Sequence, residues 1–160
     1  RICRAKIDLG EQSPGWKFAE YEMKGVPLRV ELGPKDIENN QCVVVRRDNG
    51  EKTVVSLDEL EAKLPELLKA VHDGLYNKAL ERRAAMTFEA HNLEEIKEIA
   101  DTKPGFIKAM WCGERECEDK LKEYAGITSR CIPFEQEHID GKCVCCGKEA
   151  KHMLYWGKAY

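Results

Sequence analysis

Cys112-Gly-Glu-Arg-Glu-Cys117 and Cys143-Val-Cys-Cys146 are the two stretches that decide how the second half of this chain folds. Four residues separate the thiols of the first stretch, two separate the outer thiols of the second, and 25 residues lie between the stretches. Each stretch can present two sulfur atoms from a single turn, as tetrahedral zinc requires. Four thiolates leave no position for a catalytic water, so the ion is expected to be structural. We therefore expect one structural Zn²⁺ to be bound by four ligands: Cys112, Cys117, Cys143 and Cys146.

Cys145 leaves the identity of the fourth ligand open, because it can replace Cys146 in a tighter spacing, although the two-residue spacing closes a zinc knuckle with less strain. A disulfide framework and a thiol redox pair compete with zinc. Eight cysteines in 160 residues are few for a disulfide scaffold, and Arg1 to Gly10 shows no apolar core of a secretory signal. Gly141 and Gly147 flank the second stretch as in a tight turn, which favours a zinc knuckle over a redox motif that opens a helix.

The composition excludes several classes of protein. Charged residues make up 34% of the chain and hydrophobic residues 42%, as in a folded globular protein. The longest apolar runs, such as Cys42 to Val45, are far too short to span a membrane. The net charge is −3, so any nucleic-acid site must be a local patch that reads specific groups. Unpaired thiols suit a reducing compartment, and we expect the protein to be cytoplasmic.

Strand and helix patterns along the chain predict an α/β fold. Strands are expected where apolar and polar residues alternate or where a short apolar run precedes a turn, over residues 1–9, 26–32, 41–47 and 52–57. Asp48-Asn-Gly50 predicts a hairpin between the last two strands. A long helix is expected from Pro65 to about Ala90. The remainder shows a shorter βαβ-like pattern around the cysteines, so we expect one domain over residues 1–90 and a zinc-binding domain over residues 91–160.

Several segments of the chain are distinctive in combination: Pro14-Gly-Trp-Lys-Phe18, Lys24-Gly-Val-Pro-Leu-Arg-Val-Glu-Leu-Gly-Pro-Lys-Asp36, Cys143-Val-Cys-Cys-Gly-Lys-Glu-Ala150 and Trp156-Gly-Lys-Ala-Tyr160. Together they resemble the C-terminal part of prolyl-tRNA synthetase, in its archaeal and eukaryotic-like form, over essentially the whole chain. Gly25-Val-Pro-Leu-Arg29 alone is shared with the anticodon-binding domains of related class II synthetases. The four-cysteine pattern and the terminal tyrosine make the resemblance specific to the prolyl enzymes.

The resemblance implies an anticodon-binding domain, with a mixed five-stranded sheet flanked by helices, followed by a small α/β zinc-binding domain. It also implies a parent enzyme that attaches proline to its tRNA with ATP. That chemistry and the ATP site belong to an upstream class II catalytic domain, whose arginine-bearing motifs have no counterpart here. We therefore expect this chain to bind tRNA without charging it. The family is a homodimer, mainly through the catalytic domain, and its C-terminal tyrosine carboxylate, Tyr160 here, reaches toward that domain.

The proline anticodon carries two guanines, and unstacked anticodon bases can be read along their Watson–Crick edges. A carboxylate can accept hydrogen bonds from guanine N1–H and N2–H, while a guanidinium can donate to O6 and N7. By resemblance, Glu22 and Arg29 match positions that contact the guanines, and Lys35 matches another tRNA-contacting position. The competing reading is a surface ion pair between Glu22 and Arg29 and a solvated Lys35. Arg46 and Arg47 can hold phosphates or simply solubilise the end of a strand.

Two other functions remain open from the sequence. The chain can be a stand-alone, zinc-stabilised interaction module without an RNA role, or a thiol redox enzyme. Selective binding to a proline anticodon stem-loop favours RNA recognition, whereas equal binding to all stem-loops favours the interaction module. A redox enzyme needs a reactive thiol of low pKa, which four metal-bound cysteines exclude.

Overall fold

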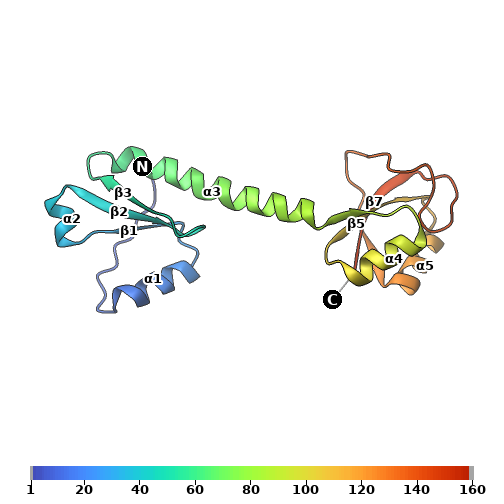
Figure 1. Ribbon diagram of the computed structural model, residues 1–160, viewed down its shortest axis with the longest axis horizontal. Coiled ribbons are helices and arrows are strands. Elements are labelled where there is room, and N and C mark those ends of the chain that lie inside the picture. Colours follow the sequence, from blue (N-terminus) through green and yellow to red (C-terminus); the bar gives the residue numbers. More distant parts are fainter. Residues whose placement is uncertain (1, 159–160) are drawn as a thin grey trace. The chain divides into compact units, whose positions relative to one another are not determined.

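The computed structural model describes residues 2–158, so the expected role of Tyr160 lies outside the described residues (Figure 1). The chain divides into two compact units, Arg1–Ala79 and Leu80–Tyr160. This division falls within the longest helix, α3 (Leu60–Ala85). The domain boundary expected near residue 90 stays a prediction. No helix over the described range combines the length and the apolar character needed to cross a bilayer.

The first unit is a three-stranded antiparallel sheet with helices on both of its faces. Its elements are α1 (Pro14–Met23), β1 (Leu28–Glu31), α2 (Pro34–Glu38), β2 (Gln41–Arg46), β3 (Lys52–Ser56) and the first part of α3. Side chains alternate across a strand, so Cys42, Val44 and Val55 share one face and pack with Leu60 and Leu67 from the start of α3. The opposite face meets α1, as Figure 1 shows.

The β2–β3 hairpin confirms the turn expected at Asp48-Asn-Gly50. Arg46 N–H donates to the carbonyl of Glu51 at 2.9 Å, and Gly50 N–H donates to the carbonyl of Arg46 at 3.0 Å. The register that follows from this turn places buried Cys42 opposite buried Val55.

The segment at residues 2–9 differs from the expected strand. It forms no strand in the described structure, and its apolar side chains Ile7 and Leu9 are 79% and 89% exposed. Lys17 instead fixes the end of this segment, because its Nζ donates to the carbonyls of Gly10 at 2.6 Å and Asp8 at 3.3 Å. Over the described residues the first sheet therefore has three strands and not five, while the α/β class with helix-flanked sheets is confirmed.

The second unit holds a four-stranded mixed sheet in the order β4-β5-β7-β6. Its elements are β4 (Thr87–Glu89), α4 (Leu93–Thr102), β5 (Phe106–Trp111), α5 (Arg115–Ala125), β6 (Ile127–Cys131) and β7 (His152–Lys158). β4 and β5 are connected by α4 and pair with each other in parallel. The other strand pairs of this sheet are antiparallel. The core contains the fully buried side chains of Ile96, Leu121, Ile127 and Trp156. Residues 87–89 were expected to end the long helix, but they are a strand because β5 supplies a hydrogen-bonding partner.

Candidate nucleic-acid interface and metal centre

Glu22 and Arg29 are brought together by the turn between α1 and β1. Ser13 caps the start of α1, its Oγ accepting a hydrogen bond from Trp16 N–H at 3.4 Å, and Lys24 ends the helix. Gly25 then adopts a positive φ of +77°, which reverses the chain into β1. As a result, Arg29 Nη1 donates to Glu22 Oε1 at 2.7 Å.

Arg29 is held from three sides, unlike the arginine of an ordinary surface ion pair. Its Nε donates to Glu31 Oε1 at 2.9 Å, and its guanidinium carbon lies 3.9 Å from the centre of the Phe18 ring. The Arg29 side chain is only 20% exposed, whereas that of Glu22 is 55% exposed. Among the described residues, Glu22 Oε2 and Arg29 Nη2 make no hydrogen bond with protein, so one acceptor and one donor group stay available to a ligand.

A small hollow adjoins the Glu22–Arg29 pair. Its lining adds an aromatic side chain, two apolar side chains and two arginines: Tyr21, Val26, Val45, Arg46 and Arg47. Its volume of about 10 Å³ holds roughly one water molecule. The hollow is therefore too small to enclose a ligand larger than a water molecule, and Glu22 and Arg29 belong to its lining.

Arg46 is part of the framework of the first unit. It donates to Asp48 Oδ2 at 2.7 Å, to Glu51 Oε2 at 3.1 Å and to the carbonyl of Ala70 in α3 at 3.1 Å. The hydrogen bond to Asp48 raises the pKa of Arg46, and the same bond lowers the pKa of the Asp48 carboxyl. Arg47 is exposed and forms no ion pair within the described residues, so its charge, unlike that of Arg46, is not engaged by the protein.

Lys35 lies on α2 and does not line the hollow. Its side chain is exposed and makes no ion pair or hydrogen bond with any described residue. The structure thus brings Glu22 and Arg29 into one site, and it leaves Lys35 as a separate positive charge on the same unit.

The four predicted metal ligands lie together in the second unit. The sulfur atoms of Cys112, Cys117, Cys143 and Cys146 all lie within 4.8 Å of one another. The sulfur of Cys112 is 3.6 Å from that of Cys117 and 3.8 Å from that of Cys146. Tetrahedral Zn²⁺ with metal–sulfur bonds of about 2.3 Å separates its sulfurs by about 3.8 Å, whereas a disulfide needs about 2.05 Å. The arrangement fits a four-thiolate zinc site.

Local structure explains how the two cysteine pairs meet. Cys112 directly follows β5, and Cys117 lies in the first turns of α5. The second pair sits on a turn in which Gly147 N–H donates to the carbonyl of Cys143 at 2.9 Å. Val144 N–H donates to the carbonyl of Met110 at 2.9 Å, which holds this turn against the end of β5.

Burial distinguishes the thiols of the cluster. Cys112, Cys117 and Cys143 are buried, and Cys146 is exposed. Burial raises the pKa of Cys112 and of Cys117, so these thiols need a nearby cation to become thiolates at neutral pH. At Cys146, burial acts to raise the pKa, but a hydrogen bond from Lys148 N–H and the neighbouring thiols outweigh it and lower the pKa to about 7. Cys145, which is half-buried against the core, does not belong to the group of four.

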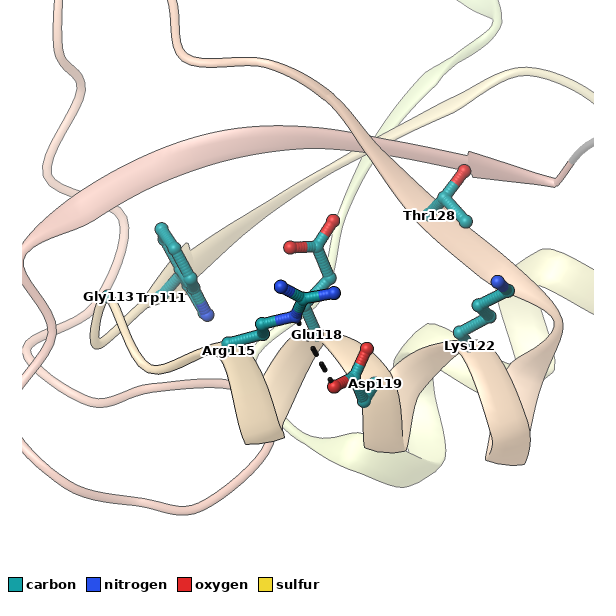
Figure 2. Close-up of a pocket in the computed structure, with 7 residues that line it drawn as sticks. All are labelled: Trp111, Gly113, Arg115, Glu118, Asp119, Lys122 and Thr128. Atoms are coloured by element: carbon teal, nitrogen blue, oxygen red, sulfur yellow. Dashed lines mark ion pairs between the residues drawn. The ribbon is translucent and has the colours of Figure 1, made fainter.

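A larger hollow of about 370 Å³ lies beside α5 (Figure 2). Figure 2 shows Trp111 at one end and Lys122 with Thr128 at the other. The charges between them are already engaged, because Arg115 Nε lies 3.8 Å from Asp119 Oδ2 and Glu118 accepts a hydrogen bond from Ser129 Oγ. No buried side-chain nitrogen or oxygen lacks a partner among the described residues. We assign no ligand to this hollow.

Phe18 and Glu31 are the site residues that the sequence did not reveal. Phe18 precedes Glu22 by four residues and therefore lies on the same face of α1. Glu31 follows Arg29 by two residues and therefore lies on the same face of β1. Both spacings are visible in the sequence, but they are common on any solvated helix or strand.

Two family models match the chain. The anticodon-binding domain matches residues 2–67, and the model described as "Prolyl-tRNA synthetase, C-terminal" matches residues 93–160. The three-stranded sheet with its Glu22–Arg29 pair lies in the first match, and the four-thiol cluster lies in the second. Fold and site therefore define the C-terminal, RNA-recognising part of a class II aminoacyl-tRNA synthetase.

Relatives of the chain are named as proline–tRNA ligases. The chain is 64% identical over 160 residues to the proline–tRNA ligase of Clostridium novyi and 61% identical to a proline–tRNA ligase 2 of Bacillus cereus, covering 100% of this chain and 34% of each relative. The prolyl-tRNA synthetase of Cryptosporidium parvum, solved with L-proline and AMP, superposes with a TM-score of 0.90 at 36% identity over 98% of this chain and 34% of that one. The chain belongs to the prolyl-tRNA synthetase family, and it spans about a third of the length of the curated relatives it matches.

Proposed function

We propose that this chain recognises the anticodon of a proline tRNA and that Glu22 and Arg29 read its guanines. The observation that carries this proposal is the 2.7 Å pair between Arg29 Nη1 and Glu22 Oε1, which leaves Glu22 Oε2 and Arg29 Nη2 without a hydrogen bond to any described residue. Each residue uses only one of its two terminal atoms in this ion pair. The other two atoms form a preformed surface for a ligand.

The order of these outer groups suits guanine. The Watson–Crick edge of guanine presents the donors N1–H and N2–H beside the acceptor O6, which match the Glu22 carboxylate and the Arg29 guanidinium. Adenine presents an acceptor at N1 beside a donor at N6, so its edge meets the two side chains in the reversed order. A well-made contact of this kind discriminates by about 1–3 kcal/mol in base readout.

Positive charges on the same unit supply the part of the affinity that is independent of sequence. Lys35 and Arg47 are exposed and unpaired among the described residues. We assign them to backbone phosphates, which explains how a chain of net charge −3 binds RNA through a local patch.

For the second unit we propose that Cys112, Cys117, Cys143 and Cys146 bind one Zn²⁺. The sulfur separations and the all-thiol ligand set support this ion. Four protein ligands give the ion a structural role, in which it ties the end of β5 and the start of α5 to the turn before β7.

The names of the relatives support a proposal for the activity of the whole protein. We propose that a catalytic domain of the same protein attaches proline to the tRNA with ATP and that this chain selects the tRNA. The names of the relatives and the structure solved with L-proline and AMP support that reaction. We further propose that the parent protein is a homodimer located in the cytoplasm, as expected for a synthetase of this family.

The test is the binding of the 160-residue chain to proline anticodon stem-loops. We expect replacement of either guanine by adenine to weaken binding about 10- to 100-fold. A stem-loop with an unrelated anticodon serves as the control for binding that does not depend on sequence. Equal binding to all three kinds of stem-loop would contradict the proposal and would favour a zinc-stabilised interaction module without an RNA role.

A further inference from the structure

We infer that Glu31 and Phe18 are positioning residues that hold the Arg29 guanidinium in the orientation needed to read guanine. This inference rests on the proposed function. It assigns a role in anticodon specificity to two side chains that need not touch the RNA.

The contacts of Arg29 define the orientation of its guanidinium completely. Hydrogen bonds from Nε to Glu31 at 2.9 Å and from Nη1 to Glu22 at 2.7 Å prevent rotation within the plane of the group. The Phe18 ring, 3.9 Å from the guanidinium carbon, fixes the tilt of that plane. Nη2 is therefore the terminal nitrogen that these three partners leave for a base.

Glu31 differs from Glu22 in its burial. Its side chain is 24% exposed, against 55% for Glu22, so water screens the Glu31 bond less. When a base hydrogen-bonds to Glu22 Oε2, the contact between Glu22 and Arg29 can lengthen. The hydrogen bond to Glu31 still holds the arginine in place. Glu31 also continues to balance the positive charge of Arg29 in that state.

A fixed guanidinium discriminates between bases, whereas a mobile one does not. An arginine free to rotate can bring a donor to the N1 acceptor of adenine as readily as to guanine O6. When Glu31 and Phe18 hold the guanidinium of Arg29, its Nη2 can donate only to an acceptor at the position of guanine O6. Loss of either residue is therefore expected to reduce discrimination more than affinity.

The experiment measures dissociation constants of the 160-residue chain for proline stem-loops bearing guanine or adenine at the read position. The specificity ratio is the adenine constant divided by the guanine constant. Glu31→Ala removes the hydrogen bond, Glu31→Gln restores an acceptor, and Phe18→Leu keeps an apolar cover without a ring face. Glu51→Ala is the matched control, because it takes a carboxylate from Arg46 in the same unit. Melting temperatures report on the fold.

We expect Glu31→Ala to lower the specificity ratio about 10-fold, Glu31→Gln to recover most of it and Phe18→Leu to lower it about 3-fold. Glu51→Ala should keep the ratio of the unchanged protein. An unchanged specificity ratio in Glu31→Ala would overturn the inference, even if the variant bound both stem-loops more weakly. If Phe18→Leu fails to fold, the specificity ratios of the two Glu31 variants decide whether the inference holds.

The proposed function is tested separately by two further arms. An unchanged chain that binds both stem-loops equally, or an Arg29→Ala variant that keeps the full ratio, would refute the proposed function and this inference with it. Selectivity that depends on Arg29 but not on Glu31 would refute the inference alone.

Discussion

Gly105 lies directly against the carbonyl of Met86: a Cβ atom at Gly105 would be 2.0 Å from that oxygen. The same carbonyl accepts the hydrogen bond from Phe106 N–H at 2.9 Å that begins the parallel pairing of β4 and β5. Gly105 also has a φ of +136°, which side-chain-bearing residues rarely adopt. No residue with a Cβ fits this position without separating the two strands.

We therefore expect Gly105→Ala to lower the free energy of unfolding by about 3 kcal/mol or more. Denaturant unfolding of the chain measures the change. Gly141→Ala is the matched control, because no atom outside Gly141 and its two chain neighbours lies within 4 Å of the added Cβ, and its effect should stay within about 0.5 kcal/mol. Equal stability of the two variants would show that β4 and β5 tolerate separation at this point.

Serine substitutions of neighbouring cysteines distinguish ligands from packing residues. If the four cysteines bind zinc as proposed, Cys146→Ser should lose the ion and lower the melting temperature, because it removes one of the four sulfur ligands. Cys145→Ser should keep one zinc per chain, as should the control Cys131→Ser, whose thiol is exposed and lies outside the group of four. Metal content and thermal unfolding measure both effects. Loss of zinc from Cys145→Ser but not from Cys146→Ser would identify Cys145 as the fourth ligand.

Lys35→Ala should weaken binding to guanine- and adenine-bearing stem-loops by the same factor, about 3-fold, because a phosphate contact carries no base information. The slope of log affinity against log salt should fall by about 0.7, the value for one contact to a single strand. Titrations at several salt concentrations measure both quantities. Lys69→Ala, which removes a lysine already paired with Asp73, is the control. A change in base preference would instead place Lys35 at a base.

Asp48→Asn tests the ion pair between Asp48 and Arg46, the arginine that joins the hairpin to α3. Arg46 lowers the pKa of Asp48 in the folded protein, so the pair contributes stability above the unfolded carboxyl pKa of about 3.9. That contribution disappears as the pH falls through the lower, folded value. The unchanged protein should therefore be more stable than the variant at pH 7, and the difference should shrink below about pH 4. Denaturant unfolding across this range measures the difference, and a gap independent of pH would contradict the role of the charge.

Local signals in the sequence predicted much of the fold. The turn at Asp48-Asn-Gly50 determined the hairpin because two adjacent residues set its geometry. The cysteine spacing predicted the four-thiol group because each pair comes from one turn.

Features that depend on distant partners were not predicted. Residues 87–89 continue a helical pattern, and only pairing with residues 106–108 makes them a strand. Conversely, residues 2–9 alternate like a strand but find no partner among the described residues. At the candidate site, resemblance predicted Glu22 and Arg29 from the sequence. It did not predict Phe18 and Glu31, because their contacts depend on where the Arg29 side chain turns.

The order β4-β5-β7-β6 has a consequence for biosynthesis. Of these four strands β7 is the last to leave the ribosome, yet it fills the gap between β5 and β6. While residues 152–158 are still in the exit tunnel, the facing edges of β5 and β6 remain open to wrong partners. The second unit therefore completes its sheet only after translation has passed β7, and a nascent chain stalled before this strand leaves the facing edges of β5 and β6 unpaired.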